Sequence, residues 1–404
     1  MSGLPSLSSP FASLLADPLC SLLPMTRPPR LASLNAMRGL AALCVAAFHF
    51  PAVFWGSQTP ALRNAYVLTN LFFALSGFLL MSAYGDRLDS AQGLRQFALR
   101  RIQRLVPLHL LATAMVLCAP YLAHASDLVL NFVLAGAYAG DVAAIDVDIK
   151  DLATQVFLAQ GVGLRPELVL NFPAWSLGVI FFCSLLLGLT CWVAPGWRHL
   201  AALGLAVAGF MVVAVLAPHR MGSTHDFGFA RGMACFFAGA AACGALKQWP
   251  TLARAGAWRV TVQAAALVAL AAFASAAPSG APVALLSPFL AVAVLLAFCD
   301  DNTDFGRFFS ARIFGWLADR SFAIFMLQAP WLFIGHQSME WSAYFGLSAF
   351  GTKTVGLFAL ASYLAVVLAC ADLAHRKVEL PLRRRWAVRK EPAANATPAL
   401  HAPS

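Results

Sequence analysis

Charged residues are scarce in this sequence. Only 11% of the 404 residues are Asp, Glu, Lys or Arg, whereas 60% are hydrophobic and the mean hydropathy is +0.73. Soluble domains carry about 25% charged residues, so this composition excludes a soluble protein and leaves no room for a sizeable soluble domain. It predicts an all-α fold, a polytopic bundle of transmembrane helices.

Cysteine pairs and internal repeats are also missing. None of the nine cysteines forms a Cys-x-x-Cys pair, and eight lie in or beside apolar stretches. We interpret them as small core residues and predict neither disulfides nor a metal site. The net charge of +10 could indicate nucleic acid, but the cations lie in short loops without an aromatic-interleaved basic patch. We therefore expect a lipid bilayer and no nucleic acid as partner.

Ten apolar stretches each approach the length of about twenty residues that a helix needs to cross hydrocarbon. They predict about ten transmembrane helices in a domain at residues 34–378, with a disordered N-terminal tail at 1–33 and a basic tail at 379–404. The stretches lie near residues 38–56, 64–84, 105–123, 174–194, 200–217, 228–246, 260–277, 283–299, 315–335 and 354–374.

The basic residues indicate how these helices are oriented. Every basic cluster falls on one side of the membrane if both termini are cytoplasmic, as the positive-inside rule requires. Residues 1–33 do not look like a secretory signal, because prolines interrupt the apolar run and the first cation, Arg27, follows it. We expect a multi-pass protein of the inner (plasma) membrane. The acidic connection at 124–173 would face outward, as an acceptor-facing surface or as a solvated loop.

The first apolar stretch has an arginine at its head and a histidine inside it. Eleven residues separate Arg38 from His49, about 20° from three whole turns, so both lie on one helix face about 16 Å apart. We expect Arg38 at the membrane surface and His49 near the bilayer middle. Arg38 could be only a positive-inside anchor and His49 only a packing residue. Ionisable groups inside a membrane are costly, however, so the pair is also a candidate site.

Other stretches allow functional or structural interpretations. Arg101 and Arg104 share a helix face, where two guanidinium groups could bind phosphates or merely anchor the helix. Ser76 and Gly77 are small residues that allow close contact between helices. Residues 378–384 form a basic amphipathic segment, expected on the cytoplasmic surface.

Five motifs follow one another along the chain. They are Arg-Gly-Leu-Ala-Ala with a following His, Leu-Phe-Phe-x-Leu-Ser-Gly-Phe, Arg-Arg-x-x-Arg-x-x-Pro, Pro-Ala-Trp-Ser-Leu and Glu-x-Pro-x-Arg-Arg. Together and in this order they resemble the membrane acyltransferase 3 family of integral membrane O-acyltransferases. The resemblance runs from about Arg38 to Arg384 and implies ten transmembrane helices. It also implies transfer of an acyl group, often acetyl, from cytoplasmic acyl-CoA to a hydroxyl on a glycan or other envelope molecule.

The resemblance places the family's Arg-x10-His motif on Arg38 and His49 and its Arg-x-x-Arg motif on Arg101 and Arg104. Three positions depart from the family pattern and bear on substrate class and on activity. Ile180 stands where an acidic residue is common, Gln328 where many members have His, and Asn35 where Asp is frequent.

Together these observations predict a mechanism. Arg38, Arg101 and Arg104 would hold the phosphates of acyl-CoA, a co-substrate rather than a bound cofactor, and His49 would act as general base on the acceptor hydroxyl. A covalent acyl-histidine is an alternative. Two other functions stay open: a transporter or flippase for an envelope lipid or glycan, and an inactive relic kept as an assembly partner. The lack of an inverted repeat disfavours the transporter.

Overall fold

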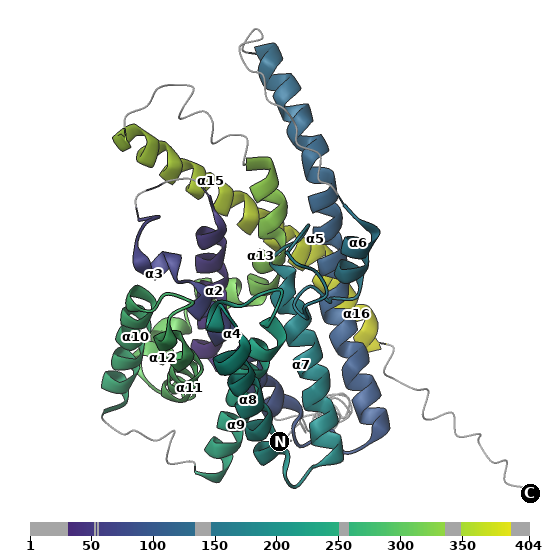
Figure 1. Ribbon diagram of the computed structural model, residues 1–404, viewed down its shortest axis with the longest axis vertical. Helices are drawn as coiled ribbons and strands as arrows, with labels where there is room; N and C mark the ends of the chain where they lie inside the picture. Colours follow the sequence, from purple (N-terminus) through teal and green to yellow (C-terminus); the bar gives the residue numbers. More distant parts are fainter. Residues whose placement is uncertain are drawn as a thin grey trace, which may run out of the picture. The chain divides into compact units, whose positions relative to one another are not determined.

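The computed structural model describes residues 31–51, 54, 56–133, 147–249, 258–335 and 349–388 (Figure 1). Throughout this part of the chain the regular structure is helical, and none of these residues forms a strand. The predicted all-α fold is therefore confirmed. The N-terminal tail and most of the basic C-terminal tail lie outside the described residues.

Within the described residues, ten helices form the body of the bundle, and shorter elements connect them. The ten are α2 (Ala32–His49), α4 (Tyr66–Tyr84), α5 (Ala91–Val133), α7 (Ala174–Val193), α8 (Arg198–Leu216), α9 (Gly228–Gln248), α10 (Arg259–Ala276), α11 (Ser287–Ala297), α13 (Arg312–Gly335) and α15 (Ala349–Ala374). The shorter elements are α3 (Pro60–Arg63), α6 (Ile149–Val156), α12 (Asp304–Phe309), α16 (Leu380–Val388), the 3-10 turns η1 (Arg220–Gly222) and η4 (Pro282–Leu286), and the π-helical turn η6 (His375–Glu379).

Among the described residues, seven helical segments are long and apolar enough to cross a membrane. They are α4, α5 up to Leu122, α7, α8, α9, α10 and the stretch Gly351–Arg384, which covers most of α15 and the start of α16. The predicted count of ten is not confirmed. The other three predicted stretches are helical, as α2, α11 and α13, but each falls short of a simple apolar span. α11 has only 11 residues, α13 carries Arg312, Asp319 and Arg320, and α2 begins with a polar turn.

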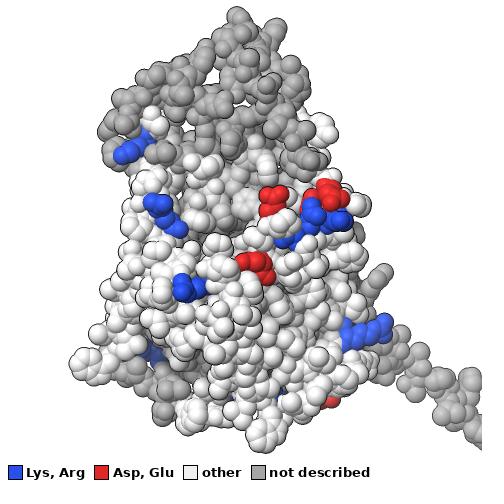
Figure 2. Space-filling view, in the orientation of Figure 1, with Lys and Arg blue, Asp and Glu red and all other residues white. Residues whose placement is uncertain are grey.

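Large apolar side chains on the outer helices face away from the protein. On α8, residues such as Leu203, Val207, Met211 and Val215 are exposed, and uncharged side chains predominate on the face shown in Figure 2. Exposed apolar surface of this extent suits a lipid environment, where it costs nothing.

Helix α2 differs from its prediction at both ends. It begins at Ala32 and ends at His49, where Phe50 leaves the helical conformation with φ −69° and ψ 118°. The cause is Pro51, whose ring disfavours the α conformation in the preceding residue. Arg38 therefore lies within the helix rather than at its head, and His49 is the last helical residue rather than a residue in the middle of a span.

Helices α4 and α9 pack with their backbones in contact. A Cβ atom on Gly77 would lie 1.8 Å from the carbonyl oxygen of Phe236, and a Cβ on Gly239 would lie 2.0 Å from that of Ala74. Only glycine permits this approach at either position. The prediction that Ser76 and Gly77 serve close helix packing is confirmed for Gly77.

The cysteines are free thiols wherever the structure describes them. Cys183 and Cys235 are fully buried, as predicted for small core residues. Cys44 and Cys118 are exposed instead, so that interpretation is wrong for these two, which lie on outward faces of α2 and α5.

Asp86, which follows α4, connects the ends of α4, α8 and α9 at one end of the bundle. We name this end the Asp86 end. Its carboxylate accepts hydrogen bonds from Arg198 at the start of α8 and from Lys247 near the end of α9. The hydrogen bond from Lys247, more than any other contact, lowers the pKa of Asp86. These contacts therefore stabilise the folded state at pH values above the ordinary carboxylate pKa. The stabilisation is lost as the pH falls through the lowered pKa of Asp86.

The opposite end of the bundle, which we name the His49 end, is closed by contacts between α4 and α10. The hydroxyl of Tyr66 donates to the carbonyl of Ala277 over 3.0 Å, and the amide of Asn64 donates to the carbonyl of Ala274 over 2.8 Å. α4 thus runs from the His49 end to the Asp86 end, and α10 runs in the reverse direction.

The predicted acidic connection is only partly loop. α5 continues to Val133, well beyond the predicted span, with Pro107 and Pro120 inside it, and α6 follows at 149–156. Residues 134–146 lie outside the described part. Arg165 pairs with Asp151 at 2.7 Å and with Asp148 at 3.5 Å, so part of the acidic charge here is neutralised within the segment.

Candidate functional site

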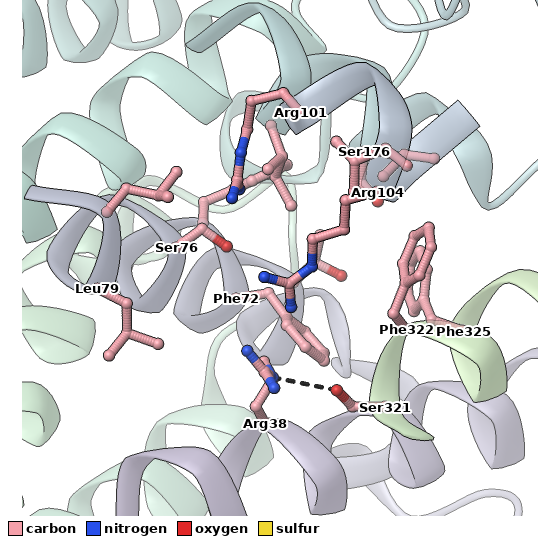
Figure 3. Close-up of a pocket in the computed structure, with 16 residues that line it drawn as sticks. Arg38, Phe72, Ser76, Leu79, Arg101, Arg104, Ser176, Ser321, Phe322 and Phe325 are labelled. Atoms are coloured by element: carbon pink, nitrogen blue, oxygen red, sulfur yellow. Dashed lines mark hydrogen bonds between the residues drawn. The ribbon is translucent and has the colours of Figure 1, made fainter. Parts of the chain in front are cut away.

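Three arginines line one cavity in the bundle, which we name the arginine cavity. Arg38 comes from α2, and Arg101 and Arg104 come from α5 (Figure 3). The close-up shows the guanidinium groups of Arg38 and Arg104 pointing toward one another across the cavity. The cavity has a volume of about 150 Å³. The structure therefore brings together the three residues that the sequence predicts to bind phosphates.

Neighbouring groups fix two of these guanidinium groups. The Nε of Arg38 donates to the hydroxyl of Ser321, and its Nη2 donates to the carbonyl of Ala318, both over 3.1 Å. Arg101 is only 7% exposed, and its guanidinium carbon lies 5.5 Å from the ring centre of Phe97 and 6.0 Å from that of Tyr84. Cation–π contacts of this kind hold an arginine in place without neutralising its charge.

No carboxylate lines the arginine cavity, although Asp319 and Glu379 interact electrostatically with Arg38 from outside its wall. Ile180 lies in the wall at the position where the resemblance leads us to expect an acid. Glu379 lines a smaller neighbouring hollow with Arg104 but is bonded to Arg383 at 3.1 Å. Several guanidinium groups without an anion attract one, and phosphate oxygens fit their planar forks.

His49 lines a second cavity, of about 170 Å³, which we name the histidine cavity. The edge of the Phe172 ring packs against the imidazole, with the ring centres 4.9 Å apart. The Nδ1 of His49 lies 3.1 Å from the Oε1 of Gln328, and the Nε2 of Gln328 donates to the carbonyl of Phe325 over 2.9 Å. Because that second bond uses the amide nitrogen, the oxygen faces the imidazole.

This contact selects one tautomer of His49. An amide oxygen can only accept, so Nδ1 carries the proton and donates it to Gln328. The lone pair on Nε2 is then available to take a proton from a substrate. Gln328 thus acts as a positioning residue at the place where many members of the resembled family have His.

Arg38 and His49 do share one helix face, as predicted. Their partners, Ser321 and Gln328, both lie on α13 and are seven residues apart, two turns of a helix. α2 and α13 therefore run side by side in the same direction. The helix ends at His49, and the depth of His49 in the membrane stays a prediction.

The two cavities have wall residues in common. Thr69 of α4 and Phe325 of α13 line both of them. The arginine cavity and the histidine cavity are thus neighbours within the bundle, separated by these side chains. A flexible chain bound by its charged end in one cavity would pass these side chains to reach the other.

Sequence reasoning missed a fourth arginine. Arg231 of α9 lines the histidine cavity and is 1% exposed. It stands inside the apolar stretch predicted at 228–246. A cation inside a predicted membrane stretch is a site candidate by default, and this signal alone could have identified Arg231.

A model of the family's acyltransferase domain matches residues 31–375, which is most of the chain and nearly all of its described part. The chain belongs to the acyltransferase 3 family. This acyltransferase is also similar to "Protein 2 in picA locus" of Rhizobium radiobacter, with 40% identity over 90 residues. That match covers 22% of the chain and spans 45% of the relative's length. No solved structure matches significantly.

The structure locates the three departures of this acyltransferase from the family pattern. Gln328 contacts His49, and Ile180 lines the arginine cavity. Asn35 bonds to the carbonyl of Leu31 one turn earlier in its own helix, over 3.0 Å. Two of the three departures therefore touch the candidate site and the third serves the start of α2.

Proposed function

We propose that this membrane acyltransferase moves an acyl group, acetyl in the simplest case, from cytoplasmic acyl-CoA to a hydroxyl of an envelope glycan. One observation carries the proposal: three guanidinium groups without a carboxylate in their cavity adjoin a cavity with an oriented, proton-accepting imidazole. The first arrangement suits the phosphates of CoA, and the second suits a hydroxyl nucleophile.

The donor would bind by its charged end. Arg101, Arg104 and Arg38 hold the phosphates in the arginine cavity, and the pantetheine arm extends between Thr69 and Phe325 toward His49. No cofactor is needed, since acyl-CoA is consumed as a co-substrate. This places the arginine cavity toward the cytoplasm, with both termini cytoplasmic and the protein in the inner membrane.

The chemistry follows from the tautomer of His49. Its Nε2 takes the proton of the acceptor hydroxyl as the oxygen attacks the thioester carbonyl. The carbon–sulfur bond of the resulting tetrahedral adduct then breaks, the acyl group stays on the acceptor oxygen, and the proton on Nε2 passes to the departing CoA sulfur. General-base catalysis of this kind contributes about 10²–10⁴ in rate, and Gln328 stabilises the imidazolium by accepting from Nδ1.

The deciding experiment is CoA release by the purified protein. Native protein in proteoliposomes receives acetyl-CoA and a glycan acceptor, and free CoA and acetylated acceptor are separated by chromatography. We expect both products in equal amounts from native protein and neither from His49→Ala. A transporter or an inactive assembly partner would release no CoA, and that result would overturn the proposal.

A further inference from the structure

Arg231 is a buried cation held by neutral groups. Its Nε donates to the Oδ1 of Asn70 over 2.7 Å, its Nη1 to the carbonyl of Ser223 over 2.8 Å, and its Nη2 to the carbonyl of Tyr66 over 3.1 Å. Asn70 is itself fixed, because its amide donates to the hydroxyl of Ser287 over 2.8 Å. The guanidinium group is therefore held rigidly in the wall of the histidine cavity.

Part of this guanidinium group remains available. Arginine has five N–H donors, and the three bonds use one on each nitrogen, which leaves one N–H on Nη1 and one on Nη2. Within the described residues Arg231 forms no ion pair. Asp226 interacts electrostatically with Arg231, no hydrogen bond joins the two side chains in the described part of the chain, and the Oδ1 of Asp226 is buried without a hydrogen-bond partner.

The mouth of the same cavity carries a second cation. Arg63, at the end of α3, lines the histidine cavity and is exposed. The walls between the two arginines include the rings of Tyr66 and Trp175, and none of the residues that line the cavity is Asp or Glu. Aromatic faces together with hydroxyl groups such as those of Thr69 and Thr224 suit a sugar ring, and two cations without a lining carboxylate suit a negative substituent on it.

We infer that the histidine cavity takes an acceptor that bears an oxyanion, a carboxylate or a phosphate, beside the hydroxyl to be acylated. Arg231 binds the oxyanion with its two remaining N–H groups, and Arg63 attracts it at the mouth. This inference rests on the proposed function and names its acceptor class: an acidic glycan rather than a neutral one. Placing the charge on Arg231 would hold the hydroxyl toward His49.

The test uses three sugars that differ in charge. Methyl glucuronide carries a carboxylate, glucose 6-phosphate a phosphate, and methyl glucoside no charge. Binding of each to purified native protein is measured by calorimetry, and acetylation of each from acetyl-CoA is measured in proteoliposomes. We expect at least one acidic sugar to bind about tenfold or more tightly than methyl glucoside, since one charge-assisted contact of about 1.4 kcal/mol is a factor of ten.

Variants separate ligand binding from structural support. Arg231→Gln removes the buried charge but also loses bonds to α4, so it can unfold. Arg63→Gln is the safer variant, because Arg63 is exposed, and it should reduce the preference for the acidic sugar severalfold. Arg312→Gln, the same change at an exposed arginine outside both cavities, is the control and should leave the preference intact.

The outcomes distinguish the two proposals. Equal binding of acidic and neutral sugars, or an acidic preference unchanged in Arg63→Gln and in folded Arg231→Gln, would overturn the acidic acceptor. If CoA is released with methyl glucoside as readily as with the acidic sugars, only this inference fails. If an acidic sugar binds selectively but no sugar ever elicits CoA release, the acyl transfer fails and the anion site stands.

Discussion

The two cavities combine their cations with different groups. The arginine cavity gathers three cations in one space without lining carboxylates, whereas the histidine cavity sets Arg63 and Arg231 beside an imidazole that an amide orients. Cations beside a base disfavour its taking up a proton. Helix α2 separates Arg38 from His49 by eleven residues, about 16 Å along a helix, so Arg38 does not share a cavity with the base.

The proposed function requires the two cavities to open toward opposite sides of the membrane. Labelling of introduced cysteines gives an all-or-none test of this orientation. Gly196, between α7 and α8, and Gly280, after α10, each have open space where a side chain would stand. We expect Gly280→Cys to react with a membrane-impermeant maleimide in intact cells and Gly196→Cys to react only after lysis. Labelling of both from the same side would refute the predicted orientation.

Loss of the base should have the largest effect on turnover. His49→Ala should lower kcat by about 10²–10⁴ while acyl-CoA still binds, because the phosphate site lies in the other cavity. Turnover is measured as CoA release, and binding by calorimetry. His219→Ala, at an exposed histidine outside both cavities, is the matched control. Near-normal turnover without His49 would make it a packing residue.

The arginine cavity is tested by keeping its charge and changing its shape. Arg101→Lys and Arg104→Lys should each weaken acyl-CoA binding by about 10- to 100-fold, because ammonium cannot replace a guanidinium fork on phosphate oxygens. Arg95→Lys, on the exposed face of the same helix, should bind normally. If all three variants bind alike, the arginines only anchor α5.

Both cavities depend on α4, which is held against α9 by backbone contact. Gly77→Ala should lower the free energy of unfolding by about 1–3 kcal/mol, since the added methyl meets the carbonyl of Phe236. Thermal unfolding in detergent measures the effect. Gly204→Ala, on α8 where a methyl meets nothing within 4 Å, should leave stability unchanged or slightly raised. Equal stability of the two variants would contradict the close packing.

The smallest effect is expected at the residue that orients the base. Gln328→Leu removes a neutral hydrogen bond of about 1 kcal/mol and should slow turnover about fivefold, less than His49→Ala. Gln328→His can restore a partner for Nδ1 and should be tolerated. CoA release compares the three variants directly. A Gln328→Leu defect as large as that of His49→Ala would mean that the site is organised differently.

The residues of the candidate site could be predicted where spacing alone decides. The spacing of Arg38 and His49 places them on one face, and that of Arg101 and Arg104 directs both to one cavity. Pro51 also indicates the end of α2. The apolar residues that follow Pro51 nevertheless favoured a longer helix in the prediction. Arg231 belongs to none of the five motifs. Only its place as an isolated charge in an apolar stretch marks it as a candidate.

Other features depend on contacts between distant segments and could not be predicted. The bond between His49 and Gln328 joins residues 279 positions apart, and nothing local to either residue indicates it. The seven apolar spans among the described residues differ from the predicted ten for a related reason. Charged residues such as Asp319 and Arg320 lower the mean hydropathy of α13. Arg320, however, is paired with Asp372 of α15 at 2.6 Å.

Helix α13 supplies a mechanical link between the two cavities. It holds Arg38 through Ser321 and Ala318 and holds His49 through Gln328. A slide or rotation of α13 against α2 would therefore release the phosphate-binding arginine and the base at the same moment. Any ligand that draws Arg38 away from α13 would change the energy of the His49 contact, and by thermodynamic reciprocity an acceptor bound at His49 would change donor affinity by the same factor.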